Sequence, residues 1–127
     1  MQAGRRITIQ AAITTDNGAL TLKANDCTGG GGRCTNNRGS GAGYILMDSG
    51  GSIDTGNGDF TATLGTQSTS GDITLRDVTT TNLVVTNNGT TSGSDILDEE
   101  ADLTVSGTSA FTTVVSDGVI TLSLIHI

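Results

Sequence analysis

A short motif of an apolar residue, a threonine and a second apolar residue returns along the whole chain. Its six copies occupy residues 7–9, 20–22, 60–62, 73–75, 103–105 and 120–122, and the apolar runs 45–47 and 83–85 resemble the same unit. Because side chains alternate between the two faces of a β-strand, each copy should direct its apolar residues inward and its threonine outward. The motif therefore predicts a chain of very short strands.

Turn-forming residues separate these motifs. Glycine, asparagine and aspartate cluster at residues 16–18, 56–59, 70–72, 87–89 and 116–118, and these residue types tolerate the backbone angles of tight turns. Weaker short strands are expected at residues 12–14, 52–54, 77–79, 95–97 and 113–115. One strong and one weak strand with their turns make a unit of about 20 residues, and such a period is typical of repeat proteins.

Strands this short favour an all-β, right-handed parallel β-helix, with about five or six coils over residues 5–121. Each strand would pair with its equivalent in the next coil, so that Ile7, Leu20, Ile73 and Leu103 share one dry interior while threonines stack outside. An antiparallel sandwich or barrel is the alternative, although its strands would usually have about 5–6 residues. The abundance of threonine and the 19 glycines disfavour a helical bundle.

The glycine-rich stretch at residues 27–43 matches no strand, and we expect it to be a loop inserted into one coil. It contains the only two cysteines, Cys27 and Cys34, separated by Thr-Gly-Gly-Gly-Gly-Arg. We expect a local disulfide between them, which implies an oxidising compartment. Two reduced thiols are the alternative. A metal site would need a second pair of ligands.

The charge of the chain excludes some partners. Six basic residues against 13 acidic ones give a net charge of −7, and the basic residues are scattered. A nucleic-acid partner is not expected, because it requires clustered lysine or arginine.

No apolar stretch approaches the roughly 20 residues that cross a bilayer, so we expect no membrane span.

The sequence predicts no catalytic, cofactor-binding or metal-binding residue and no cofactor. The densest charge is the acidic cluster of Asp95, Asp98, Glu99, Glu100 and Asp102, which we interpret as a solvated loop, with weak cation binding or a glycosidase pair as alternatives.

Three other features have residue types that could take part in chemistry. Arg76 and Asp77 are the best candidates for polysaccharide chemistry, although the chain is poor in aromatic residues. The turn at residues 56–60 differs from calcium-binding repeats because Asp59 directly precedes Phe60. His126, the only histidine, is assigned no role.

The triplets and turns together resemble the filamentous haemagglutinin-like proteins, which are large bacterial exoproteins of the two-partner secretion type. Residues 6–24 look much like one coil of their shafts, and residues 71–75 and 102–107 look similar. Autotransporter passengers, which are also β-solenoids, are nearly as similar. The resemblance implies a shaft segment of a secreted or surface-exposed bacterial adhesin, without enzyme activity.

The same resemblance implies a set of partners. Loops on the rigid solenoid would bind glycans or proteins of host or neighbouring cells, and an outer-membrane transporter would serve secretion.

The alternative function is that of a carbohydrate-active β-helix, a polysaccharide lyase or hydrolase.

Residues 122–127, Leu-Ser-Leu-Ile-His-Ile, resemble a translated transposon-adapter end. We therefore expect the natural sequence to stop near Thr121 and the last six residues to be a non-native tail. A genuine last strand is the alternative.

Overall fold

The fold is all-β in the computed structural model, which describes residues 1–26, 41–66, 69–99, 102–122 and 125–126. These residues form 14 strands, all paired in parallel, in three sheets. Among the residues that the structure describes, there is no helix that could span a lipid bilayer. The predicted right-handed parallel β-helix is confirmed.

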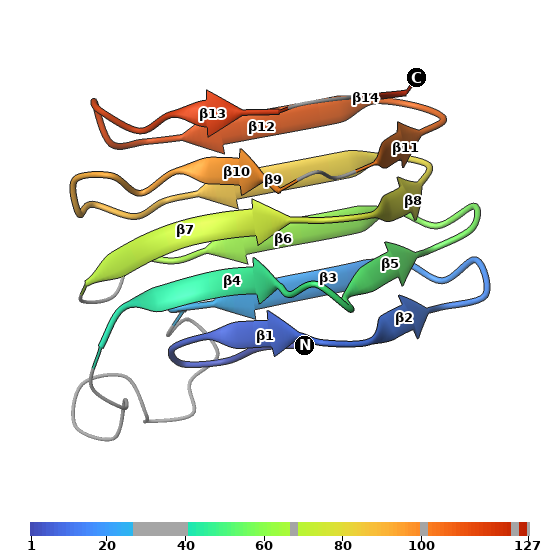
Figure 1. The fold of residues 1–127 in the computed structure, drawn as a ribbon, viewed down its shortest axis with the longest axis horizontal. Helices are drawn as coiled ribbons and strands as arrows, with labels where there is room; N and C mark the ends of the chain where they lie inside the picture. Colours follow the sequence, from blue (N-terminus) through green and yellow to red (C-terminus); the bar gives the residue numbers. More distant parts are fainter. Residues whose placement is uncertain (27–40, 67–68, 100–101, 123–124, 127) are drawn as a thin grey trace.

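Each sheet takes one strand from every coil. The first sheet contains β1 (Ile7–Ile9), β4 (Gly43–Met47), β7 (Ser70–Leu75), β10 (Ile96–Asp98) and β13 (Ile120–Thr121). The second contains β2 (Ala12–Thr14), β5 (Ser52–Asp54), β8 (Val78–Thr80), β11 (Leu103–Val105) and β14 (Ile125–His126). The third contains β3 (Leu20–Ala24), β6 (Phe60–Leu64), β9 (Leu83–Asn87) and β12 (Ser109–Thr113). Figure 1 shows the first two sheets side by side and the third behind them.

Four coils are complete, and β13 and β14 begin a fifth. This number is at the low end of the expected range because a coil has three strands and is longer than the predicted unit. Ile53, Val78 and Leu103 occupy equivalent positions at intervals of 25 residues. The first coil is longer, since Ile13 pairs with Ile53 across the glycine-rich stretch.

Most predicted strands are present, but two expectations were wrong. Residues 113–115 were expected to be a strand, whereas the strand of that coil is β12, which ends at Thr113. Its register is set by pairing with the five residues of β9. Residues 70–72 were expected to form a turn, whereas they begin β7. There, pairing with β4 outweighs the turn preference of Gly71 and Asp72.

The core is aliphatic and continuous through the stack. Ile7, Ile73 and Leu103 are buried as predicted, while Leu20, the first residue of β3, is half-buried and packs against the core. The largest fully buried side chain is Phe60. At about 25 cal/mol for each Å² of apolar surface removed from water, these side chains supply the main stabilisation of the stack.

The outer columns are more mixed than the predicted threonine ladders. In the third sheet Thr21 stacks on Thr61, but Val84 follows in the next coil. In the first sheet Leu46 lies between Thr8 and Thr74. Thr74 also departs from the expectation of an exposed threonine, because it is only 7% exposed.

Polar side chains at the corners join one coil to the next. In each case a side-chain oxygen accepts a hydrogen bond from a backbone N–H one coil further on. The pairs are Asn17 with Asn57, Asp72 with Asp95, Asp77 with Asp102, Asn82 with Thr108 and Asp95 with Val119, at 2.7 to 3.1 Å. The acidic and amide residues of the turns therefore satisfy backbone groups that the strands leave unpaired.

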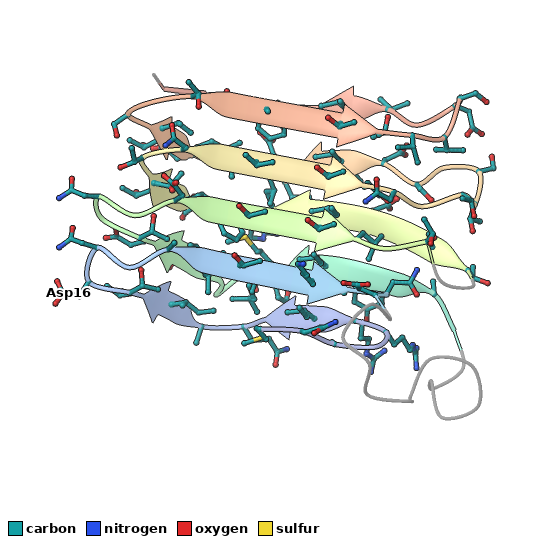
Figure 2. All side chains as sticks on the ribbon, turned by 180° about the vertical axis from the view of Figure 1, so that it is seen from behind. Asp16 is labelled. Atoms are coloured by element: carbon teal, nitrogen blue, oxygen red, sulfur yellow. The ribbon has the colours of Figure 1, made fainter. Side chains whose placement is uncertain are left out.

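The turn before β3 has the backbone that its sequence predicts. Asp16 and Asn17 both have positive φ, and the N–H of Gly18 donates to the carbonyl of Thr15 at 3.0 Å. Two positive φ values define a type I′ turn, for which these residue types are favoured. Figure 2 shows Asp16 projecting from the end of this turn into solvent.

Two segments with predictions of their own, the insertion at residues 27–43 and the tail at residues 122–127, are only partly covered by the described residues. The insertion at 27–43 joins β3 to β4, and Gly43 is already the first residue of β4. Cys27 and Cys34, with their predicted disulfide, lie outside the described residues. Of the tail at 122–127, Leu122 packs against the core, and β14 pairs with β11.

Candidate functional site

A shallow, open cavity of about 230 Å³ lies on the outer face of the first sheet, between the second and third coils. Its lining comes from β4 and β7 only, namely Tyr44, Ile45, Leu46, Gly71, Asp72 and Thr74. Ile45 points into the core, so the outer surface of the cavity is formed by the other five residues. Most of these side chains lie at outward positions of their strands.

An irregularity in strand pairing creates this cavity. Gly43 pairs with Ser70 and Ile45 pairs with Ile73, so that one residue of β4 faces two residues of β7. Such a β-bulge changes the direction of side chains locally. Here it places Gly71 and Asp72 opposite Tyr44, and Gly71 contributes no side chain to the outer face.

The backbone of the bulge is held from inside the molecule. The buried Asn87 donates its amide hydrogens to the carbonyl of Gly71 at 3.1 Å and to that of Asp95 at 2.9 Å. Its amide oxygen accepts the N–H of Gly89 at 2.9 Å. The position of Gly71 is therefore set by a fully satisfied interior side chain.

Tyr44 is the only tyrosine of the chain, and it forms one wall of the cavity. The guanidinium carbon of Arg6, one coil earlier, lies 5.7 Å from the centre of the Tyr44 ring, within the range of a cation–π contact. On the side of the next coil, a Cβ on Gly71 would lie 3.8 Å from the Tyr44 Cβ. Tyr44 is thus covered by Arg6 on one side and faces the cavity on the other.

Several polar atoms at this cavity keep hydrogen-bonding capacity. Asp72 accepts the N–H of Asp95 through Oδ1 at 3.0 Å, and its Oδ2 has no partner among the described residues. The hydroxyls of Thr74 and Tyr44 also have none within the described part of the chain. The cavity therefore offers an apolar wall, two hydroxyls and one carboxylate oxygen to a ligand.

A column of polar and charged side chains, Gln10, Asp48, Arg76 and Glu99, runs beside the cavity with one member in each of four coils. Gln10 donates to Asp48 Oδ2 at 3.3 Å, and Arg76 forms an ion pair with Glu99 at 3.0 Å. The N–H of Ser49 donates to Asp48 at 2.8 Å. This bond, the Gln10 bond and the charge of Arg76 hold the pKa of Asp48 below its ordinary value.

The residues considered for polysaccharide chemistry have structural contacts instead. Arg76 donates to the side chain of Glu99 and to its carbonyl at 3.2 Å. Asp77 accepts the N–H of Asp102 at 3.1 Å. Their side chains serve different coil-to-coil contacts and do not line the cavity.

The described members of the acidic cluster make separate contacts. Asp95 accepts a backbone N–H, Asp98 ends β10 and Glu99 pairs with Arg76, while Glu100 lies outside the described residues. Within the described ranges, no three histidine, cysteine, aspartate or glutamate residues are placed to hold a metal ion. Asp59 accepts a hydrogen bond from Asn82 at 2.8 Å, as an ordinary turn residue would. His126 belongs to β14.

Sequence reasoning missed the cavity for a physical reason. Side chains alternate between the two faces from Gly43 to Met47, which places Tyr44 and Leu46 on the outer face. This pattern can be recognised in the sequence. However, the partner of Tyr44 depends on the bulge in β7. Because β7 lies about one coil further along the chain, only the three-dimensional pairing brings Asp72 and Thr74 into the same cavity as Tyr44.

Comparisons with known proteins leave the site to be interpreted from its geometry. No protein-family model, no curated protein and no solved structure matches the chain.

Proposed function

We propose that this chain is a structural shaft segment of a large secreted or surface-exposed bacterial adhesin. The observation that carries the proposal is the parallel stack, in which equivalent strands of successive coils pair through all three sheets. A stack of this kind is a quasi-one-dimensional rod, since each coil contacts its immediate neighbours. Such a rod holds binding groups at a distance from the surface that carries it.

The distribution of polar groups supports a structural role. The carboxylates of Asp72, Asp77 and Asp95 join neighbouring coils by accepting backbone N–H groups. The alternative of polysaccharide cleavage rests on Arg76 and Asp77, and both have structural partners. The geometry therefore supports the shaft better than the lyase or hydrolase.

The proposal includes the place where this segment would act. According to this proposal, the protein is secreted to the bacterial outer surface through an outer-membrane transporter. Its partners are glycans or proteins on host or neighbouring cells. The outer face of the first sheet and the loops between sheets are the surfaces available for these contacts (Figure 1).

The test is an adhesion assay with the full chain. Beads coated with the purified 127-residue protein are expected to adhere to cultured epithelial cells, or to bacterial cells, severalfold better than albumin-coated beads. The matched control is Ile73→Asp, which buries a carboxylate in the core and should lose both adhesion and the β circular dichroism signal. Adhesion no greater than that of albumin on every cell type would contradict the proposal.

A further inference from the structure

We propose that the cavity between β4 and β7 binds one neutral pyranose residue of a glycan. The proposal rests on the adhesive function above and names the chemistry of its partner. It follows from three properties of the cavity, namely its shape, its polar atoms and its charge.

The shape fits a single ring inserted beside Tyr44. Arg6 occupies one side of the tyrosine, and the glycine at position 71 leaves space on the side of the next coil. A pyranose has a face of C–H groups that packs on an aromatic ring, and the side chain of Leu46 extends the apolar wall. Because the cavity of about 230 Å³ is open, the rest of a glycan can continue into solvent.

The polar atoms fit the hydroxyl edge of the same ring. Asp72 Oδ2 accepts hydrogen bonds from sugar hydroxyls, and the hydroxyls of Thr74 and Tyr44 both donate and accept. A purely apolar ligand would remove Asp72 Oδ2 from water without supplying it a hydrogen-bond donor, which is costly. A metal ion would find one carboxylate where several oxygen ligands are needed.

The charge favours a neutral sugar over an acidic one. Asp72 lines the cavity, and the only cation in contact with its wall among the described residues is Arg6, which lies over the far side of Tyr44. Asp95 follows Asp72 in the next coil, and Asp48 comes directly after the end of β4. An anionic sugar would therefore be repelled by these carboxylates, whereas a neutral sugar would not be.

The experiment uses the fluorescence of Tyr44, which reports this site alone because the chain has one tyrosine and no tryptophan. The full chain is titrated with a panel of neutral methyl pyranosides, with methyl glucuronide as the anionic comparison. At least one neutral sugar should change the fluorescence with a Kd on the order of 1 mM or weaker, as a small ligand in an open site allows.

Two variants test the position of the ligand. Gly71→Val fills the cavity and should weaken binding at least about tenfold. A Cβ at this position makes only ordinary contacts of 3.4 to 3.8 Å, and a β-branched residue suits a strand such as β7. Asp72→Asn keeps an acceptor for the Asp95 N–H and should weaken binding severalfold. Thr63→Val, on the outer face of the third sheet, is the matched control and should bind like the parent.

The outcomes separate this proposal from the one on which it rests. No response of Tyr44 to any neutral pyranoside, or equal binding by Gly71→Val, overturns the sugar site. If beads coated with Gly71→Val still adhere to cells like the parent, the adhesive function stands and this site is not its contact. If sugar binding is observed without cell adhesion, the shaft proposal fails and the sugar site stands.

Discussion

Asn87 is a fully buried polar residue with three hydrogen bonds, all of them to backbone groups. It lies at the end of β9, in an inward column that also contains Ala24 and Leu64. Buried polar groups persist where every donor and acceptor is satisfied. At the scale of single residues, this fold uses such side chains to connect the end of one coil to the start of the next.

Replacing Asn87 by alanine should therefore destabilise the protein by about 3 kcal/mol, because two carbonyls and one N–H lose their partner inside the molecule. Chemical denaturation with urea measures the change in unfolding free energy. Asn88→Ala, one residue further along, is the control and should change it by less than about 0.5 kcal/mol. Equal effects of the two variants would contradict this role of Asn87.

Asp48 gives a prediction for pH dependence. Its pKa in the folded protein lies below the unfolded value of about 3.9. The contribution of Asp48 to stability is therefore present above that unfolded value and is lost as the pH falls through the folded pKa. A carboxyl NMR titration should show the lowered pKa, and Gln10→Ala should raise it toward the ordinary value. A midpoint at or above the ordinary value in the parent would refute the prediction.

At the scale of elements, the close approach of successive turns depends on glycine. A Cβ on Gly58 would lie 2.5 Å from the carbonyl oxygen of Gly18 in the coil before it. In contrast, a Cβ on Gly71 would meet nothing nearer than 3.4 Å. The first glycine is required by backbone contact between coils, whereas the second leaves space on the outer face.

Gly58→Ala is accordingly expected to lower the unfolding free energy by about 1–3 kcal/mol, since one of the two turns must shift. Gly71→Ala should change it by less than about 0.5 kcal/mol. Thermal and urea unfolding of the two variants, side by side, measure the difference. If Gly71→Ala proves as destabilising as Gly58→Ala, the description of the bulge is wrong.

The strands themselves were largely predictable at this scale. The alternation at Leu103, Thr104 and Val105 shows which side chains are buried, and the structure agrees. The failures occurred where pairing outweighed local preference. Ser109 to Thr113 became a strand because β9 offers a five-residue partner, although only Phe111 is a large apolar residue.

For the whole molecule, stability should vary along the stack. Strands of the third coil, such as β7, pair with a strand on each side, while β13 has one neighbour among the described residues. The side chain of Ile120, the first residue of β13, is 41% exposed. In a stack of units that contact only their neighbours, the outer coils open at lower cost than the inner ones.

Amide hydrogen exchange followed by NMR should show this gradient. The N–H of Ile73, bonded to the carbonyl of Asp95, should exchange at least about 100-fold more slowly than the N–H groups of β13, because opening from the β13 end must separate β13 from β10 before β10 leaves β7. Uniform protection from β1 to β13 would instead indicate that the stack opens as one unit.

The sequence by itself determined the strand class, the inward face of most short strands and the chemistry of most turns, because these depend on neighbours within a few residues. Only the tertiary structure decided the number of coils, the register and the cavity at Tyr44. Partners in this fold are roughly one coil apart, at intervals such as 25 residues between Ile53 and Val78. A one-residue bulge at Gly71 changes which side chains meet, and the energy that selects it comes from the paired strands and the buried Asn87.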